Sequence, residues 1–219
     1  MPVLSLVLYS LYLALAFGLR VAIQLRRTGS TGLSGIGGRP AERIAGAGFV
    51  LAALLGLAAP VLALLGRVEP INGLDTNWVY AVGAVLALLG IVGTFYAQIA
   101  MGDSWRIGVD AEERTELVTD GPFAYVRNPI YSAVIPTALG LALLVPSWVA
   151  IVGFVGLAIA LEVQVRLVEE PYLLRAHGAA YAGYAARVGR FAPGVGRMRA
   201  SAPRPRRLDG RGRSRVGQG

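Results

Sequence analysis

The sequence contains no cysteine and no lysine, and it has one histidine among its 219 residues. Without cysteine the chain can form no disulfide, no thiolate nucleophile and no cysteine-based metal site. The single histidine, His177, cannot hold a metal ion by itself, so we predict that there is no metal site. Since lysine is absent, all 21 basic residues are arginines.

Charged residues are also scarce. They make up 16% of the chain, against 55% hydrophobic residues and a mean hydropathy of +0.57, whereas soluble domains are about one quarter charged. This composition predicts an integral membrane protein. No stretch remains that is long enough for a separate water-soluble catalytic core, so any chemistry must lie on the membrane helices and their ends.

The apolar residues form five runs. They cover residues 3–25, 44–65, 78–100, 130–145 and 148–168. The first could instead be a signal peptide, with Ala14 and Ala16 imitating a cleavage site, but its positive charges follow the apolar run. We therefore predict an all-α polytopic fold with about five transmembrane helices. Only Pro146 and Ser147 separate the last two, which predicts a tight helical hairpin whose first arm is short and contains Pro136.

The loop arginines predict the orientation. Arg26, Arg27, Arg39 and Arg43 lie between the first two runs, and only Arg67 lies between the second and third. Positively charged loops stay in the cytoplasm. We therefore expect the N-terminus outside, with residues 101–128 and everything after residue 168 on the cytoplasmic face.

The last 23 residues hold eight arginines and one acid, Asp209. Residues 197–219 therefore form a predicted disordered tail that contacts anionic lipid headgroups. Nucleic acid would suit the same charge, but no aromatic residues alternate with these arginines. We divide the rest into three N-terminal helices (residues 1–100) and a C-terminal core (residues 101–196).

Three motifs fall on the predicted cytoplasmic face. The first is GPFAYVRNPIY, residues 121–131. Asn128 is placed to cap a helix that Pro129 begins, and Arg127 beside this helix start predicts a surface anion site. Tyr125 and Tyr131 flank it. The alternative is an interfacial aromatic belt whose arginine binds phospholipid headgroups.

The second motif is LEVQVRLVEEPYLL, residues 161–174. Glu162, Arg166 and Glu170 follow at intervals of four, so they should share one helix face and pair, with Glu169 also within reach of Arg166. Acids at the end of a membrane helix indicate function, although an ion-paired helix end is the simpler alternative. Pro171 should kink or restart the helix.

The third motif is HGAAYAGYAARVGRFAP, residues 177–193. Gly178 is expected to break the helix. After it, Tyr181, Tyr184 and Val188 follow a helical stripe with arginines beside it, among them Arg190. Taken alone, this pattern is typical of an amphipathic surface helix.

In this order, the three motifs resemble the isoprenylcysteine carboxyl methyltransferase and phospholipid methyltransferase group of integral membrane enzymes. The resemblance covers residues 101–196, and the first two apolar runs carry none of it. It implies that the C-terminal half binds S-adenosylmethionine and transfers its methyl group to a lipophilic acceptor that enters from the bilayer. Asn128 stands where the family usually has histidine, and it cannot act as a general base.

The resemblance also implies a set of site residues. The implied cofactor contacts are Tyr125, Arg127, Asn128, Pro129, Tyr131, Glu169, Glu170, His177 and Tyr181. Arg127, Arg190 and Glu170 are the implied catalytic residues, with both arginines orienting the acceptor or the cofactor carboxylate. Two alternatives stay open: a membrane sterol or lipid reductase that uses NADPH, and a small transporter or scaffold without a cofactor.

Overall fold

The computed structural model describes residues 1–31, 40–105 and 116–199. Across these ranges the regular structure is helical, with one isolated β-bridge. The elements in chain order are α1 (Pro2–Leu13), η1 (Ala14–Leu19), α2 (Arg20–Thr28), α3 (Pro40–Leu64), α4 (Asn77–Ala100), η2 (Gly102–Ser104), η3 (Gly121–Ala124), α5 (Pro129–Leu144), α6 (Trp148–Val163), η4 (Gln164–Glu169) and α7 (Glu170–Arg187). The all-α fold predicted from the sequence is confirmed.

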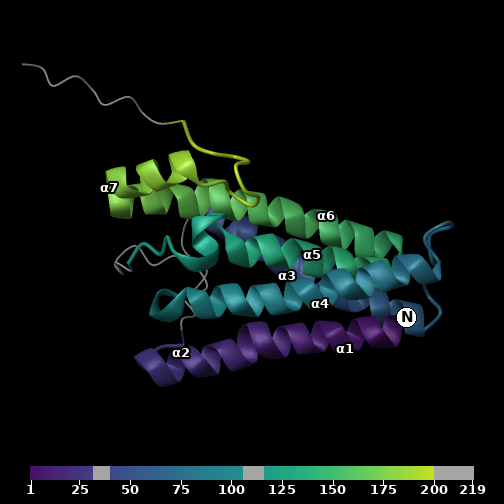
Figure 1. Cartoon of the computed structure of the whole chain (residues 1–219). Helices are drawn as coiled ribbons and strands as arrows, with labels where there is room; N and C mark the ends of the chain where they lie inside the picture. The colour runs from purple at the N-terminus through teal and green to yellow at the C-terminus, as the bar shows by residue number, and fades with distance from the viewer. Residues whose placement is uncertain (32–39, 106–115, 200–219) are drawn as a thin grey trace, which may run out of the picture.

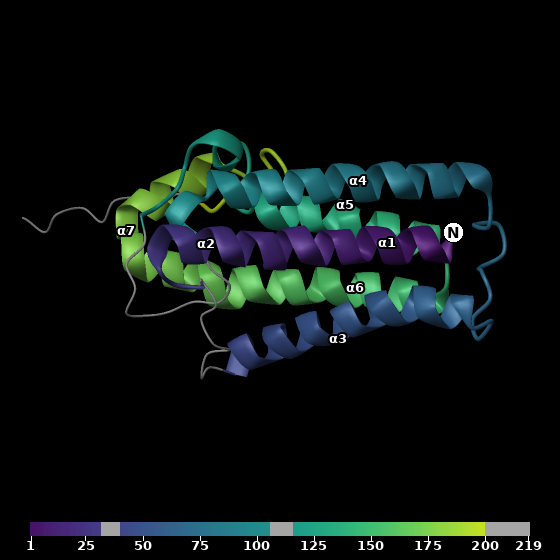
Figure 2. The same ribbon diagram turned by 90° about the horizontal axis from the view of Figure 1, so that it is seen from below.

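The long helices run side by side in one bundle (Figures 1 and 2). Four helices are long and apolar enough to cross a membrane: Pro2–Thr28, Pro40–Leu64, Asn77–Ala100 and Trp148–Arg187. The fifth, α5, has 16 residues and contains Pro136, so it spans only about 24 Å. The short first arm of the hairpin is therefore as expected, and so is its tight turn, where the hydroxyl of Ser147 accepts a bond from the backbone N–H of Ala150.

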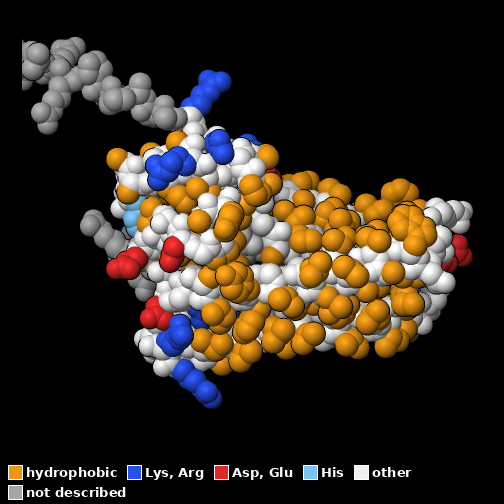
Figure 3. All heavy atoms as spheres, viewed as in Figure 1, with side chains coloured by type: hydrophobic (Ala, Val, Ile, Leu, Met, Phe, Trp, Pro, Cys, Tyr) orange, Lys and Arg blue, Asp and Glu red, His pale blue; other side chains and the backbone are white. Residues whose placement is uncertain are grey.

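On the face shown in Figure 3, apolar side chains form a broad band, and most of the charged side chains gather at one end. We call this the polar end; it holds the end of α2, the start of α3, residues 101–105, residues 116–128 and α7. The opposite end carries the N-terminus, the α3–α4 loop and the hairpin turn, which the bond from Ile71 N to Pro146 O joins at 2.7 Å. The protein is thus a multi-pass membrane protein with its polar motifs at one end.

Helices α4 and α5 form the most extensive contact in the bundle, because small residues line both surfaces. A Cβ atom added to Gly90 would lie 2.2 Å from Oγ1 of Thr137, and one added to Gly140 would lie 2.4 Å from the backbone N of Ala87. Close backbone approach through small residues is the usual way in which helices associate inside a bilayer. This packing holds the start of α5, and the motif before it, at the polar end.

Two six-residue π-helical turns interrupt the membrane helices: η1 in the first and η4 between α6 and α7. The second bears out the expectation that the helix restarts at Pro171. Helix α7 begins at Glu170, directly after the wider turn, and Pro171 lies in its first turn, where a missing N–H is tolerated. The chain turns back at Gly178, whose φ of 51° and ψ of −123° are not helical (Figure 1). The predicted break at Gly178 is confirmed.

The expectation of an arginine-rich, lipid-binding tail falls almost entirely on residues 200–219, which lie outside the described residues. The division of the chain at residues 100 and 196 stays a prediction.

Candidate functional site

The backbone brings the first and third motifs together. Val126 and Gly189 form a parallel bridge, and the N–H groups of Arg127 and Asn128 donate to the carbonyls of Gly189 and Arg190 at 2.8 and 3.1 Å. The hydroxyl of Ser132 in α5 donates to the carbonyl of Phe191 at 2.8 Å. Residues 62 positions apart are thereby fixed at the start of α5.

Glu170, from the second motif, completes this junction. Its Oε1 accepts bonds from Nη2 of Arg127 and Nε of Arg190, both at 2.8 Å, and its Oε2 accepts from Nη2 of Arg190 at 3.0 Å. The side chains of Arg127, Arg190 and Glu170 are only 1%, 13% and 6% exposed. We call these three residues the Glu170 cluster. The hydrogen bonds of Arg190 to Glu170 raise the pKa of the Arg190 guanidinium, so this arginine is a permanent cation.

The adjacent carboxylate has different partners. The hydroxyl of Tyr131 donates to Oε1 of Glu169 at 2.5 Å, and the amide of Gln164 donates to the same oxygen at 3.2 Å. The ring of Phe49, from α3, lies 6.4 Å from that of Tyr131. Glu169 is half-buried. The two neighbouring acids therefore serve different environments: Glu170 meets two guanidinium groups, and Glu169 meets neutral donors on the α5 side.

Two expectations for the first motif need correction. Arg127 is not a surface anion site: its Nη1 donates to the carbonyl of Ala185, and its Nη2 donates to Gly196 as well as to Glu170. Asn128 occupies the capping position with Pro129 after it, but its side chain makes no cap and donates to the carbonyl of Arg190 at 3.2 Å. In both cases the chain after Gly189 supplies acceptors that the local sequence does not reveal.

The expected pairing on one face of the second motif is half right. Arg166 pairs with Glu162 as predicted, in an exposed ion pair, but Glu170 pairs with Arg127 and Arg190 instead. The π-helical turn η4 lies between these positions. A turn wider than 3.6 residues shifts the register, so the interval of four no longer keeps Glu170 above Arg166.

The tyrosine stripe of the third motif is not a membrane-facing surface. Tyr181, Tyr184 and Ala185 are buried and pack with Leu117, Leu173, Val188 and Met198. The hydroxyl of Tyr184 donates to the carbonyl of Phe123 at 2.6 Å and so holds the turn of the first motif. Burial raises the pKa of Tyr181, and it raises that of Tyr184 to about 12. Both phenols are therefore protonated at neutral pH and can donate hydrogen bonds.

Two residues implied as cofactor contacts are not drawn into the cluster. Tyr125 is 70% exposed, and His177 is half-buried at the end of the first arm of α7. Within the described ranges, no hydrogen bond or ion pair joins either of them to the Glu170 cluster. Their roles stay predictions.

Reasoning from the sequence missed Gly189. A Cβ atom there would lie 2.0 Å from the carbonyl oxygen of Ala192 and 2.8 Å from the backbone N of Gly194. Only glycine fits this tight return of the chain, which carries Arg190 to Glu170. The signal was present as the glycine between two arginines in RVGR, residues 187–190.

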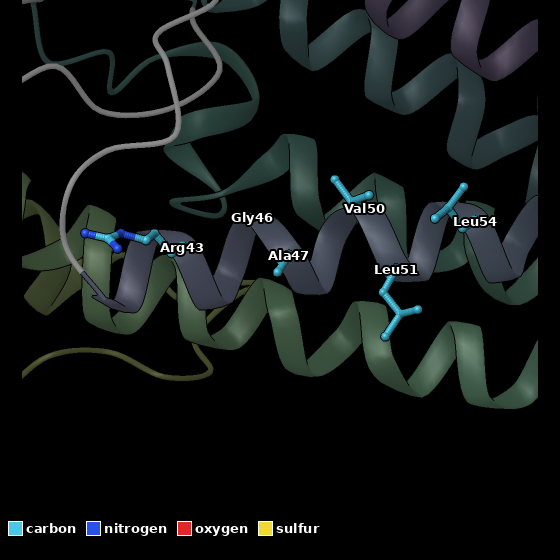
Figure 4. A pocket seen from close by; sticks show the side chains of 6 residues that line it. All are labelled: Arg43, Gly46, Ala47, Val50, Leu51 and Leu54. Atoms are coloured by element: carbon cyan, nitrogen blue, oxygen red, sulfur yellow. The ribbon is translucent and has the colours of Figure 1, made fainter.

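A shallow hollow lies elsewhere, along the outer surface of α3. It has a volume of about 420 Å³, and small or apolar residues line it from Gly46 to Leu54 with Arg43 at one end (Figure 4). Neither this hollow nor the smaller one beside Pro146 is lined by the Glu170 cluster. The hollow on α3 offers a place for an apolar chain on the outer surface of the bundle.

Comparison with known proteins relates these features to a family. Residues 78–180, from the start of α4 into α7, match the phospholipid methyltransferase family. The chain is also 28% identical over 106 residues to the uncharacterized protein YpbQ of Bacillus subtilis (strain 168). That alignment covers 48% of this chain and 62% of the length of YpbQ.

The fold is similar to that of a solved structure, the eukaryotic intramembrane Ras methyltransferase ICMT (isoprenylcysteine carboxyl methyltransferase). The TM-score is 0.58 at 20% sequence identity, over 90% of this chain and 70% of the other. This similarity concerns the fold alone. The match over residues 78–180 agrees with the resemblance seen in the motifs: this part of the multi-pass membrane protein is similar to the phospholipid methyltransferase family.

Proposed function

We propose that this protein transfers a methyl group from S-adenosylmethionine to a lipophilic acceptor at the polar end of the bundle. One observation carries the proposal: the three motifs meet at Glu170 in contacts of 2.8 to 3.0 Å, although Arg127 and Arg190 are 63 positions apart in the chain. A chain that used these motifs only as an interfacial belt would not need two arginines buried on one acid.

The donor set at this end suits S-adenosylmethionine. The carboxylate of this cofactor calls for a cation or amide donors, and its ammonium and ribose diol call for acids. Its sulfonium calls for an aromatic ring. Glu169, Asn128 and Tyr131 supply an acid, an amide and a ring within one junction. In addition, Nε of Arg127 is buried without an acceptor among the described residues. The residues present therefore fit this cofactor.

The contacts favour a division of labour between the two acids. Glu170 is already bound by Arg127 and Arg190, so it positions the first and third motifs and leaves little capacity for a ligand. Glu169, with Tyr131 and Gln164 as neutral neighbours, is the better candidate to bind the ammonium or the ribose hydroxyls. We assign Arg127 as a positioning residue and Glu169, Asn128 and Tyr131 as cofactor contacts.

When bound, the cofactor supplies an electrophilic methyl group on a sulfonium, which the acceptor attacks in line. The chain's own contribution is to orient the two partners and to exclude water. Asn128 cannot take a proton, since an amide is not basic. An acceptor that is already ionised, such as a carboxylate or a thiolate, therefore fits this site without a general base. Arg190, a permanent cation, is placed to attract such an anion.

A lipophilic acceptor accords with the shape of the molecule. On the face shown in Figure 3 the apolar band reaches to the polar end. The side chains of Val50, Leu51 and Leu54 that line the hollow on α3 are also apolar and exposed. A prenylated cysteine carboxylate, a phospholipid or a quinone-like molecule would each reach the site from the bilayer.

Titration calorimetry tests the proposal. The full-length protein in detergent should bind S-adenosylhomocysteine saturably, and Glu169→Gln should weaken this binding about tenfold or more, because a charged hydrogen bond is lost. Glu162→Gln is the matched control, since Glu162 lies in an exposed ion pair about two turns away. NADPH is the second ligand: its binding in place of S-adenosylhomocysteine would identify a reductase. Binding of neither would leave a protein without a cofactor.

The orientation and the tail are further parts of the proposal. We place the polar end in the cytoplasm, on the basis of the loop arginines, and we propose that the tail binds anionic lipid. Because the chain has no cysteine, single cysteines give a clean test of the orientation. In intact cells an impermeant maleimide should label Asn72→Cys and not Ala192→Cys. The reverse pattern would invert the topology.

A further inference from the structure

A second buried polar cluster lies away from Glu170, between the first helix and α4. Arg20 begins α2 directly after the π-helical turn η1, and it is 1% exposed. Its Nη2 donates to the carbonyl of Gly102 at 2.6 Å, and its guanidinium lies 4.5 Å from the ring centre of Trp105. Neither contact supplies a negative charge. Among the described residues, no carboxylate lies within ion-pair distance of Arg20.

Several polar atoms around Arg20 are unpaired. Within the described part of the chain, Nε and Nη1 of Arg20 are buried and have no acceptor, and Oε1 of Gln24 and Oε1 of Gln98 have no donor. The other ends of both amides are fixed: Nε2 of Gln24 donates to the carbonyl of Asp103, and Nε2 of Gln98 donates to that of Ala16. Unpaired donors of Arg20 and unpaired acceptors of the two amides therefore occur in the same part of the bundle, where the first helix meets α4.

The π-helical turn helps to explain how this cluster is built. The backbone N–H of Arg20 donates to the carbonyl of Leu15. The carbonyl of Ala16 can therefore accept from the side-chain amide of Gln98. Turns of this kind occur frequently at functional sites. The other one, η4, stands in the same relation to Glu170 as η1 does to Arg20, since each ends immediately before a buried charge.

A buried guanidinium without a counter-ion is expensive inside a membrane protein, and it indicates a functional site whose partner is to be found. Arg20 lies 18 residues beyond Pro2, or roughly 27 Å along the helix, near the limit of a hydrocarbon core about 30 Å thick. This is the depth of lipid headgroups at the polar end. Lipid head groups are a source of anionic oxygens at this depth.

We propose that Arg20, with Gln24 and Gln98, binds the anionic head group of a lipid that carries a hydroxyl or N–H donor beside its charge. The free donors of Arg20 bind the anionic oxygens, and the unpaired amide oxygens accept from the neighbouring donor. Carboxylate and phosphate heads share this chemistry. The site does not depend on the methyl transfer proposed above, because it lies on other helices and contains none of the cofactor contacts.

Four probes in detergent solution test the proposal on the full-length protein. Oleoyl lysophosphatidic acid carries a phosphate and a hydroxyl, oleate carries only a carboxylate, and monoolein has the same chain without charge. Inorganic phosphate is the free anion. The dissociation constants should rise in the order lysophosphatidic acid, oleate, monoolein. Arg20→Gln should weaken the binding of lysophosphatidic acid and of oleate about tenfold or more. The affinity for monoolein should be unchanged.

Matched variants separate this site from general attraction. Arg27→Gln removes an arginine two turns away that is 54% exposed and pairs with Asp103 at 3.7 Å, and it should leave all affinities within about twofold. Gln24→Leu keeps Arg20 but removes one hydrogen-bond acceptor. It should therefore reduce the difference in affinity between lysophosphatidic acid and oleate. This second variant keeps the test decisive if Arg20→Gln does not fold.

Three outcomes would overturn the proposal. The first is equal affinity of the wild type for monoolein and for the anionic lipids, and the second is an equal loss of affinity in the Arg20→Gln and Arg27→Gln variants. The third is inorganic phosphate binding as tightly as lysophosphatidic acid. S-adenosylhomocysteine binding serves as the separate readout. It should be unchanged in Arg20→Gln, so a failure here and a failure of the proposed methyl transfer are distinguishable.

Discussion

Arg190 makes a bidentate contact with the carboxylate of Glu170: its Nε lies 2.8 Å from Oε1, and its Nη2 lies 3.0 Å from Oε2. Arg127 approaches the same carboxylate from the other motif. Replacing Glu170 with glutamine would leave two buried guanidinium groups without an anion. We expect Glu170→Gln to lower the free energy of unfolding by about 3 to 5 kcal/mol and to abolish methyl transfer.

Chemical unfolding in detergent measures this loss, with Glu162→Gln as the control. Glu162 also pairs with an arginine, but its side chain is 43% exposed, so its loss should amount to about 1 kcal/mol or less. Equal losses in the two variants would show that the Glu170 cluster is not the junction of the three motifs.

The packing of α4 against α5 gives a second prediction. Gly90→Ala would place a methyl carbon 2.2 Å from Oγ1 of Thr137 and 2.6 Å from its backbone nitrogen, so the helices must separate. We expect a loss of about 1 to 3 kcal/mol or a failure to fold. In α6, Gly156→Ala meets nothing within 4 Å and should be neutral or slightly stabilising. Thermal unfolding compares the two, and a stable Gly90→Ala would rule out close backbone contact.

Gly178 gives a third prediction, for the return of the chain. Its φ of 51° with ψ of −123° suits glycine alone, so Gly178→Ala should cost about 1 to 3 kcal/mol. Because the second arm of α7 carries Tyr184 and Ala185 to the first motif, S-adenosylhomocysteine binding should weaken as well. Gly183→Ala, whose Cβ would make an ordinary contact of 3.7 Å, is the control. Unchanged binding in Gly178→Ala would separate this turn from the site.

The buried hydroxyl of Tyr184 predicts a dependence of stability on pH. Burial raises its pKa to about 12 in the folded protein, above about 10 in the unfolded chain. Between these values the unfolded chain releases the proton and the folded protein keeps it. The contribution of Tyr184 is therefore complete below about pH 10 and falls by about 1.4 kcal/mol per pH unit up to about pH 12.

Unfolding of the wild type and of Tyr184→Phe at pH 9 and pH 11.5 measures this contribution. At pH 9 the wild type should be the more stable, since its hydroxyl bonds to Phe123. The difference should shrink or reverse at pH 11.5. A difference that does not change with pH would contradict the proposed ionisation.

Much of the fold and part of the site were predictable from the sequence. The apolar runs predicted the membrane helices because a bilayer requires about 20 apolar residues in each span. The pair Pro146-Ser147 predicted the hairpin, and Gly178 predicted the break in α7. The order of the motifs also predicted the similarity to the methyltransferase family whose pattern residues 78–180 match.

Other features were inaccessible to local reasoning. The interval of four between Glu162, Arg166 and Glu170 predicted one shared face, and only Glu162 and Arg166 pair, because the π-helical turn that shifts the register has no sequence signature of its own. Arg127 read as an exposed anion site because its acceptors, Ala185 and Gly196, lie 58 and 69 residues further along the chain. Arg20 was visible only as an exception within an apolar run.

The sequence by itself determined that the chain lies in a membrane, which segments form its apolar helices, and which charged and aromatic residues gather at one end. These follow from local composition, since water and lipid select residues segment by segment. Only the tertiary structure decided which charge meets which: Glu170 meets Arg127 and Arg190, Glu169 meets Tyr131, and Arg20 meets no acid among the described residues. Such partners depend on helix register and on chain reversals, which contacts between distant segments fix.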